Sequence, residues 1–279
     1  MPHDLLRALA IFAAGLAAGT INTVVGSGTL ITFPTLLAFG YPPVLANVSN
    51  NVGLVPGVAS GVYGYRAELG GQRRRLIRLG SASVCGGLVG AILLLTLPQS
   101  AFKAIVPALI AVAVVMVVIQ PRLARWVAER QRARAALVTP DGASAEVPAA
   151  AGDDAAVPAS REAIGGPVLW VLVFLAGIYG GYFGAAQGVL LIGMLGIALN
   201  DSLQRINGAK NVLAGLVNGL AAVVFILATH IDWGVAGLIA AGSVIGGQVG
   251  ARIGRRLPPW GLRVVIVCVG IAALVKLLA

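Results

Sequence analysis

Long stretches of apolar residues follow one another along nearly the whole chain, and few charged residues interrupt them. Charged residues make up only 11% of the 279 positions, whereas a soluble domain usually has about a quarter. A helix that crosses the apolar core of a bilayer, which is roughly 30 Å thick, needs about 20 such residues. The sequence therefore predicts an all-α polytopic membrane protein, in which 38 glycines allow the helices to pack closely.

The chain also matches itself at an offset of 160 residues. Nine of sixteen residues are identical between Ser83–Pro98 and Ser243–Pro258, and the same offset superimposes Gly28 on Gly188. One offset that relates such distant motifs indicates a duplication. We therefore predict two homologous transmembrane repeats, residues 1–120 and 166–279, joined by a cytoplasmic linker at 121–165.

Two kinds of sequence make up the linker. Arg122–Arg134 is basic and is predicted to extend the preceding helix. The Ala/Pro/Asp-rich stretch Thr139–Ser160 has too few bulky apolar residues to fold alone, so we predict that it is disordered and without a catalytic role.

Each repeat divides into about five helical segments, so that the chain has 8–10 segments including short or re-entrant ones. The second segment of each repeat has about 12–14 residues, which as a helix covers roughly 20 Å. Broken or re-entrant helices at matching places in two halves are typical of a transporter's binding site. The segments are approximately 5–25, 28–40, 44–65, 78–97 and 101–120, then 166–184, 187–200, 205–229, 234–254 and 260–278.

Basic residues favour an inverted topology of the two repeats. With five segments in each half, loops 66–78, 121–165, 200–210 and 252–263 share one side and hold 17 of the 20 Lys and Arg residues. With four spans in each half and parallel repeats, the division is 13 against 7. Because basic residues collect in cytoplasmic loops, we predict inverted repeats, both termini in the periplasm, and a multi-pass protein of the inner membrane.

The net charge of +10 does not indicate a nucleic-acid partner, since most arginines lie in short loops beside apolar segments, where they orient a membrane protein. Cys85 and Cys268 lie in apolar stretches without metal-ligand spacing. We interpret both as small buried apolar residues and predict no metal and no cofactor.

Two polar triads are the first candidate binding residues. Their members are spaced i, i+3, i+4, which places three side chains on one helix face. At about 12 Å from a helix start, polar groups are costly unless they are paired or face an aqueous cavity. The alternative is that the amides merely bridge packed helices. The triads are Asn47, Asn50 and Asn51 in the first repeat and Asn207, Lys210 and Asn211 in the second.

Lys210 carries the most specific signal. A lysine at that depth must be neutral, reach an interface, or be matched by an anion. Reaching the interface is the main alternative, because Lys210 lies about two turns from a helix start. No acidic residue is predicted at the same depth, which argues for a ligand anion and against cation transport. The ten acidic residues lie in predicted loops, termini or segment ends: Asp4, Glu68, Glu129, Asp141, Glu146, Asp153, Asp154, Glu162, Asp201 and Asp232.

Glycine-rich stretches occupy the junction between the first and second segments of each repeat. A helix that restarts there directs free N–H groups at a cavity, which suits an oxyanion; the alternative is that the glycines only allow tight helix crossing. Gln187 is the side-chain donor expected there, with isolated Asn22 and Asn218 as weaker candidates. The candidate glycines are Gly26, Gly28, Gly184 and Gly188. The paired elements Gly86–Ala91 and Gly246–Ala251 are interpreted as packing surfaces.

These motifs resemble the sulfite exporter TauE/SafE family of membrane transporters. The resemblance covers both halves and rests on GTINTVVGSGTLITFPTLLAFGYPP and NVSNNVG, then GIYGGYFGAAQGVLLIGMLGI and RINGAKNVLAGLVN. It implies transport of sulfite, sulfoacetate or related small anions, with the Gly-rich turns and the Asn-bearing helices forming the substrate site. This chain departs from strict symmetry, because Lys210 takes the place of Asn50 and Met194 that of Pro34.

We therefore predict a secondary transporter that moves a small anion, such as a sulfur oxyanion or sulfonate, by alternating access. A channel or a non-transporting membrane partner is the second possibility. An intramembrane enzyme is the third, because Gly26–Gly28 faintly resembles a serine-protease motif; Val25 stands where that motif has glycine. The expected partners are the small anion and the lipid bilayer, and the sequence predicts no oligomeric state.

Overall fold

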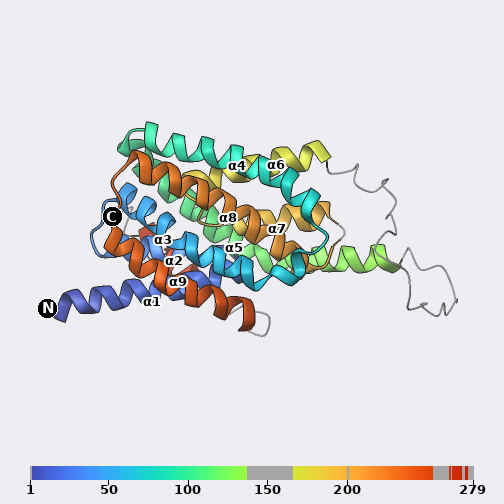
Figure 1. The fold of residues 1–279 in the computed structure, drawn as a ribbon, viewed down its shortest axis with the longest axis horizontal. Coiled ribbons are helices and arrows are strands. Elements are labelled where there is room, and N and C mark those ends of the chain that lie inside the picture. The colour runs from blue at the N-terminus through green and yellow to red at the C-terminus, as the bar shows by residue number, and fades with distance from the viewer. Residues whose placement is uncertain are drawn as a thin grey trace.

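The computed structural model describes residues 2–136, 166–199, 201–253, 264, 266–271 and 274–275. These residues form a bundle of helices joined by short turns, without a strand among them. Most helices run roughly along the long axis of the bundle (Figure 1). Their bounds are α1 (Pro2–Val24), α2 (Thr29–Ala38), α3 (Pro43–Gly64), η1 (Arg66–Leu69), α4 (Arg73–Thr96), α5 (Gln99–Ala136), α6 (Gly166–Tyr182), α7 (Gln187–Ala198), α8 (Leu203–Ala228) and α9 (Trp233–Ile253).

The helices agree closely with the predicted apolar segments. The predicted basic extension is confirmed, since α5 continues to Ala136, so the expected repeat boundary at residue 120 falls inside a helix. Helix α4 begins at Arg73 rather than at 78. The stretch predicted to be disordered lies outside the described residues, as does most of the last predicted segment.

Helix lengths separate spanning helices from short ones. Five helices of the described residues are long and apolar enough to cross a membrane: α1, α4, the first part of α5, α8 and α9. Helices α2 and α7 have 10 and 12 residues, which corresponds to about 15 and 18 Å and cannot cross a core of roughly 30 Å. The all-helical polytopic architecture is therefore confirmed.

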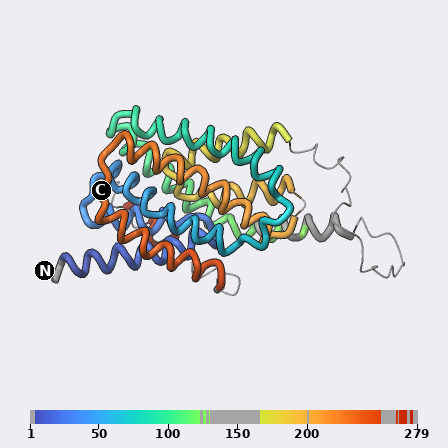
Figure 2. Tube along the Cα trace, viewed as in Figure 1, coloured from blue at the N-terminus to red at the C-terminus, as the bar shows by residue number. Residues whose placement is uncertain are grey.

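Helices of the two predicted repeats interlock. Helix α9 packs against α1 and α3, and α4 packs against α6 and α8. Figure 2 shows these pairs along opposite edges of the bundle, α1 with α9 below and α4 with α6 above. Because an offset of 160 carries α1 onto α6 and α4 onto α9, the two pairs of contacts correspond. Neither half could bury its helix faces without the other.

Glycines make these helix pairs possible. A Cβ at Gly246 would overlap the carbonyl oxygen of Leu16 on α1, and one at Gly86 would overlap that of Phe174 on α6. The hydroxyl of Thr20 donates to the carbonyl of Gly246 over 3.1 Å, across the same interface. Close backbone approach through small residues is how helices associate in lipid. The interpretation of the Gly86–Ala91 and Gly246–Ala251 elements as packing surfaces is confirmed.

The surface of the bundle is apolar over its spanning helices. Leu227 on α8 is 81% exposed and Val223 is 53% exposed, which suits a lipid-facing surface and not water. The prediction that the two cysteines are buried was wrong, because Cys85 and Cys268 are both exposed. An apolar stretch cannot distinguish burial against protein from exposure to lipid, since both environments favour the same residues.

Helices α1 and α6 begin at opposite ends of the bundle (Figure 1). Each is followed by a short helix that packs against it, α2 after α1 and α7 after α6. The two resulting pairs bring their connecting turns into the interior of the bundle, where Ser27 and Ala185 are fully buried.

Replacing Gly246 by Leu should separate α9 from α1. We expect the thermal-unfolding midpoint in detergent to fall by at least about 3 °C, because overpacking costs roughly 1–3 kcal/mol. Gly237→Leu is the matched control, since it lies on the same helix with no atom within 4 Å of a Cβ. Equal midpoints for the two variants would contradict the packing role of Gly246.

Candidate functional site

The first helix of each half ends in a glycine turn. Gly26 after α1 has φ +90° and Gly184 after α6 has φ +73°, a region that side chains rarely adopt. The N–H of Gly26 donates to the carbonyl of Ile21, and that of Gly184 to the carbonyl of Tyr179, each over 3.0 Å. These are helix endings of the left-handed glycine type. They stop both helices in the interior and let the chain reverse into α2 and α7.

The two connections touch each other. The N–H of Gly188, in the first turn of α7, donates to the carbonyl of Gly26 over 3.2 Å. A Cβ on either glycine would lie 2.5 Å from the other's Cα, closer than non-bonded carbon atoms can approach. The alternative that the glycines allow two segments to cross closely is therefore correct for Gly26 and Gly188. The contact also joins residues that are far apart in the sequence, and it brings Ser27 and Gln187 into the same region.

The polar triad of α8 faces the end of α1. Lys210 donates from Nζ to the main-chain oxygens of Asn22 and Thr23, over 3.0 and 3.1 Å. Asn207 and Asn211 donate from Nδ2 to the same Thr23 oxygen, over 3.3 and 3.4 Å. Lys210 is 1% exposed. The alternative that its ammonium reaches the membrane surface is therefore wrong.

Helix geometry explains how the ammonium is stabilised there. The last carbonyls of a helix lack intrahelical partners and carry partial negative charge, so a cation is favoured beside them. Asn22 and Thr23 provide these carbonyls at the end of α1. Within the described residues Lys210 makes no ion pair; the ion pairs recorded there join Asp201 to Arg75 and Arg205. The amino group is thus held by main-chain dipoles, which would leave much of a positive charge on it uncompensated.

The triad of α3 makes related contacts with the other half. Asn47 donates from Nδ2 to the carbonyl of Tyr182, the last residue of α6, over 3.1 Å. Each half therefore places an asparagine against the end of the other half's first helix. Asn50 donates to the hydroxyl of Thr29 over 3.4 Å, and Asn51 to the side chain of Asn218 over 3.5 Å. The alternative that these amides bridge packed helices is correct for all three contacts.

Several buried polar groups near the α1 end and the two turns share one partner or have none. Three side chains share the Thr23 oxygen, which has two lone pairs. Two further buried donors, Ser27 Oγ and Gln187 Nε2, have no protein partner, and Oδ1 of Asn207 has no donor. A buried polar group is normally paired. The site therefore has unused hydrogen-bonding capacity that a small ligand with acceptor oxygens, together with water, can satisfy.

The structure brings together only part of the predicted set. Lys210, Asn207, Asn211 and the touching glycines lie at the α1 end, whereas Asn50 and Asn51 contact other partners. Asn22 contributes its main-chain oxygen rather than its side chain. Gly28 packs on the preceding helix, where a Cβ would overlap the carbonyl of Ala18. Gly184 forms the second turn.

Two residues of the site were missed by sequence reasoning. Tyr65 is buried and its hydroxyl accepts from Asn207 over 2.8 Å, although its position after the end of α3 carries no distinguishing pattern. Ser27 is fully buried without a partner. The available signal was its place between Gly26 and Gly28, in the predicted glycine-rich junction.

A polar network surrounds the start of α8, on the amino-terminal side of Lys210. Asp201 accepts from Arg75 and Arg205, both over 2.7 Å. Gln72 donates to the carbonyl of Arg205 over 3.3 Å, and Arg205 donates to the carbonyl of Gly70 over 3.0 Å. This network, called the latch below, fastens the segment between α3 and α4 to the start of α8. No group of three metal-ligating side chains is found in the described ranges.

Interrupted helices whose ends meet around buried polar groups, inside a bundle of helices long enough to span a membrane, are typical of membrane transporters. The chain belongs to the sulfite exporter TauE/SafE family, whose family model matches residues 11–277. The resemblance noted from the sequence motifs is confirmed, and the protein is a multi-pass membrane transporter.

Relatives with curated names support the same class. A "Probable membrane transporter protein ORF9" from Sinorhizobium sp is 25% identical over 270 residues, which covers 96% of this chain and 91% of that protein. A "Probable membrane transporter protein" from Haemophilus influenzae is 26% identical, with 90% and 85% covered. "Probable membrane transporter protein YfcA" from Escherichia coli is 23% identical, with 100% and 91% covered. No solved structure matches the chain.

A double-mutant cycle should detect the contact between Asn207 and Tyr65. We expect Asn207→Ala and Tyr65→Phe to be non-additive in the free energy of unfolding, with a coupling of about 0.6–1.7 kcal/mol, as for buried hydrogen bonds between membrane helices. Unfolding in detergent or bicelles is the measurement. The cycle of Asn207→Ala with Tyr63→Phe serves as control, because Tyr63 is 62% exposed; equal coupling in both cycles would contradict the assignment.

Proposed function

We propose that the protein is a secondary carrier that moves a small anion across the inner membrane, and that the anion binds beside Lys210 at the meeting of α1, α7 and α8. Sulfite, or a related sulfur oxyanion or sulfonate, is the substrate class suggested by the family's description. The carrier binds its substrate without chemical conversion, so no catalytic residue is assigned.

A buried lysine without a carboxylate partner, close to turns that hold unpaired donors, is the observation that carries this proposal. Lys210 is 1% exposed and has no carboxylate partner in the described part of the chain. Ser27 and Gln187 hold unpaired donors beside the touching turns. A small oxyanion offers both the negative charge and several acceptor oxygens, which are what the site lacks. Its binding would also lower the cost of keeping the ammonium out of water.

The amino-terminal ends of α2 and α7 favour the same charge. Both short helices begin at the junction of the two halves, near Gly28 and Gln187, and neither has a side-chain cap. The dipole of each helix favours an anion near its start, although in α7 the N–H groups of Gln187, Gly188 and Val189 already donate to main-chain oxygens. The stem of Lys210 lies beside this junction, since a Cβ at Gly188 would come within 3.1 Å of its Cδ.

Alternating access requires a barrier that opens on one side at a time, and the latch is a suitable barrier. Arg205 lies five residues before Lys210 on α8, a rise of about 7.5 Å. The latch carries three arginine hydrogen bonds over the start of that helix. We propose that it closes the cytoplasmic route to the site and that its rupture opens it. Polar contacts suit this task, because water can replace each partner when the latch opens.

An inverted relation between the predicted repeats would supply the alternate states. Helices α1 and α6 start from opposite ends of the bundle in Figure 1, and the interlocked pairs α1 with α9 and α4 with α6 correspond. If one half can adopt the conformation of the other, the access route changes sides while the central site is kept.

Lys210→Met should abolish most anion flux while the protein still inserts. Loss of a charge-assisted hydrogen bond costs about 1.5–3 kcal/mol, which corresponds to a roughly 10- to 100-fold weaker apparent affinity. The measurement is uptake of sulfite, compared with sulfate, thiosulfate and chloride, by proteoliposomes that contain the purified full chain.

Lys103→Met is the matched control, because Lys103 is exposed on α5, and it should leave flux unchanged. Saturation with sulfite concentration is expected of a carrier, whereas a conductance that does not saturate would indicate a channel. Wild-type sulfite flux in the Lys210→Met variant would remove the lysine from the substrate site.

The proposed topology can be tested with single cysteines in a variant that lacks Cys85 and Cys268. Arg74→Cys should be protected from a membrane-impermeant thiol reagent in intact cells, and His230→Cys should react. Both positions are exposed, so the side of the membrane on which each lies, and not burial in the protein, determines whether the reagent reaches it. Reaction at position 74 in intact cells, with protection at 230, would reverse the proposed orientation.

A further inference from the structure

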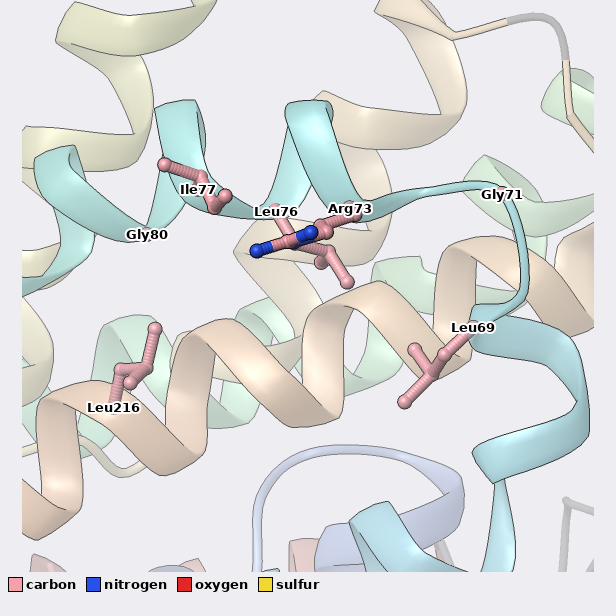
Figure 3. A pocket seen from close by; sticks show the side chains of 7 residues that line it. All are labelled: Leu69, Gly71, Arg73, Leu76, Ile77, Gly80 and Leu216. Atoms are coloured by element: carbon pink, nitrogen blue, oxygen red, sulfur yellow. The ribbon is translucent and has the colours of Figure 1, made fainter.

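A pocket unrelated to the Lys210 site opens between α4 and α8. Its volume is about 410 Å³. The segment that follows η1 closes one end and the facing sides of the two helices form the walls (Figure 3). The lining residues are Leu69, Gly71, Arg73, Leu76, Ile77, Gly80 and Leu216.

The pocket faces the lateral surface of the bundle. Ile77 on α4 is 64% exposed and Leu216 on α8 is 40% exposed. Both helices are long and apolar enough to cross a membrane, so this surface lies against lipid. Gly80 leaves space between α4 and α8, since a Cβ there would come within 3.1 Å of the Leu216 side chain.

Arg73 is the charged residue among those that line the pocket. Arg73 is exposed, and its guanidinium extends from the start of α4 toward the space that faces Leu216 (Figure 3). Helix α4 begins at this same residue without a side-chain cap, so its free N–H groups add to the positive potential. Toward Gly80 the lining is apolar. The distance from Arg73 to Gly80 along the helix is about 10 Å.

We propose that this pocket binds one anionic phospholipid, with the headgroup phosphate at Arg73 and the start of α4 and the upper part of an acyl chain against Ile77, Gly80 and Leu216. The phosphate offers a bidentate partner for the guanidinium. Basic pockets between membrane helices on the cytoplasmic side are suited to anionic headgroups. The order along the groove, charged and then apolar, follows the order of groups in a phospholipid.

Such a lipid would bear on the conformation of the protein. Gly71 and Arg73 lie in the segment whose neighbours Gly70, Gln72 and Arg75 take part in the latch. A bound lipid and the latch would then both hold this one short segment. The proposal stands independently of the transported substrate.

The test compares thermal-unfolding midpoints of the purified full chain in an uncharged detergent, with added phosphatidylglycerol or phosphatidylcholine. Phosphatidylglycerol should raise the midpoint of the wild type by at least about 3 °C, and phosphatidylcholine should raise it less. Arg73→Gln should lose this difference. Arg74→Gln removes the same charge one residue away, outside the pocket lining, and should keep it.

Filling the apolar part provides a second arm. Gly80→Leu, or Leu216→Trp if the first variant does not fold, keeps Arg73 but occupies the acyl groove, and should also abolish the phosphatidylglycerol effect. Soluble glycerol 3-phosphate, which has the charged group without a chain, should not stabilise the wild type. Two results would overturn the proposal and indicate a general effect of surface charge. One is an equal loss of the phosphatidylglycerol stabilisation in Arg73→Gln and Arg74→Gln. The other is an undiminished stabilisation in the variant with the filled pocket.

Discussion

The ammonium of Lys210 against the end of α1 is the contact on which the interior of this protein depends. A helix that ends inside a membrane protein leaves carbonyl oxygens without partners, and no bulk water is there to satisfy them. A lysine buried alone is equally unfavourable. Placed together, the oxygens of Asn22 and Thr23 and the Nζ of Lys210 satisfy each other over 3.0 and 3.1 Å. Interrupting α1 and burying the lysine are therefore two parts of one arrangement.

The same constraint applies at α6, with a different solution. Its last carbonyl, on Tyr182, accepts from the neutral amide of Asn47. The position that corresponds to Lys210 holds Asn50, whose amide turns to Thr29 in its own half. One helix end is thus held by a cation and the other by an amide. The site between them is electrostatically one-sided, which is how a nearly symmetric bundle can present a single charged group to a ligand.

Interlocking of the halves sets how this site can move. Helix α9 packs on α1 and α3, and α4 packs on α6 and α8, so each half is completed by a helix from the other. Glycine-mediated contacts such as Gly246 with Leu16 are rigid, because backbone touches backbone. The contacts of the latch are side-chain hydrogen bonds at a helix start, which break at lower cost. We expect the halves to move relative to each other where polar side chains join them. We expect them to stay rigid where glycines bring their backbones into contact.

Much of the architecture was already determined by the sequence. Apolar runs of bilayer length predicted the helices, and short Gly-interrupted runs predicted α2 and α7, because the length of a helix and the thickness of a bilayer are both fixed quantities. The triad spacing placed Asn207, Lys210 and Asn211 on one face for the same geometrical reason. The acidic residues, confined to loops and ends, indicated that Lys210 would have no carboxylate partner at its own depth.

Only the tertiary structure decided what these groups face. The way the two halves cross determines that Lys210 donates to main-chain oxygens almost 190 positions away and that Gly26 contacts Gly188. It also determines that Tyr65 and Ser27 belong to the same region. Main-chain acceptors carry no sequence signature, since every residue has one. Exposure of Cys85 was likewise undecidable, because lipid and protein interior select the same apolar residues. Local pattern determined the helices and their polar faces, and long-range packing decided their partners.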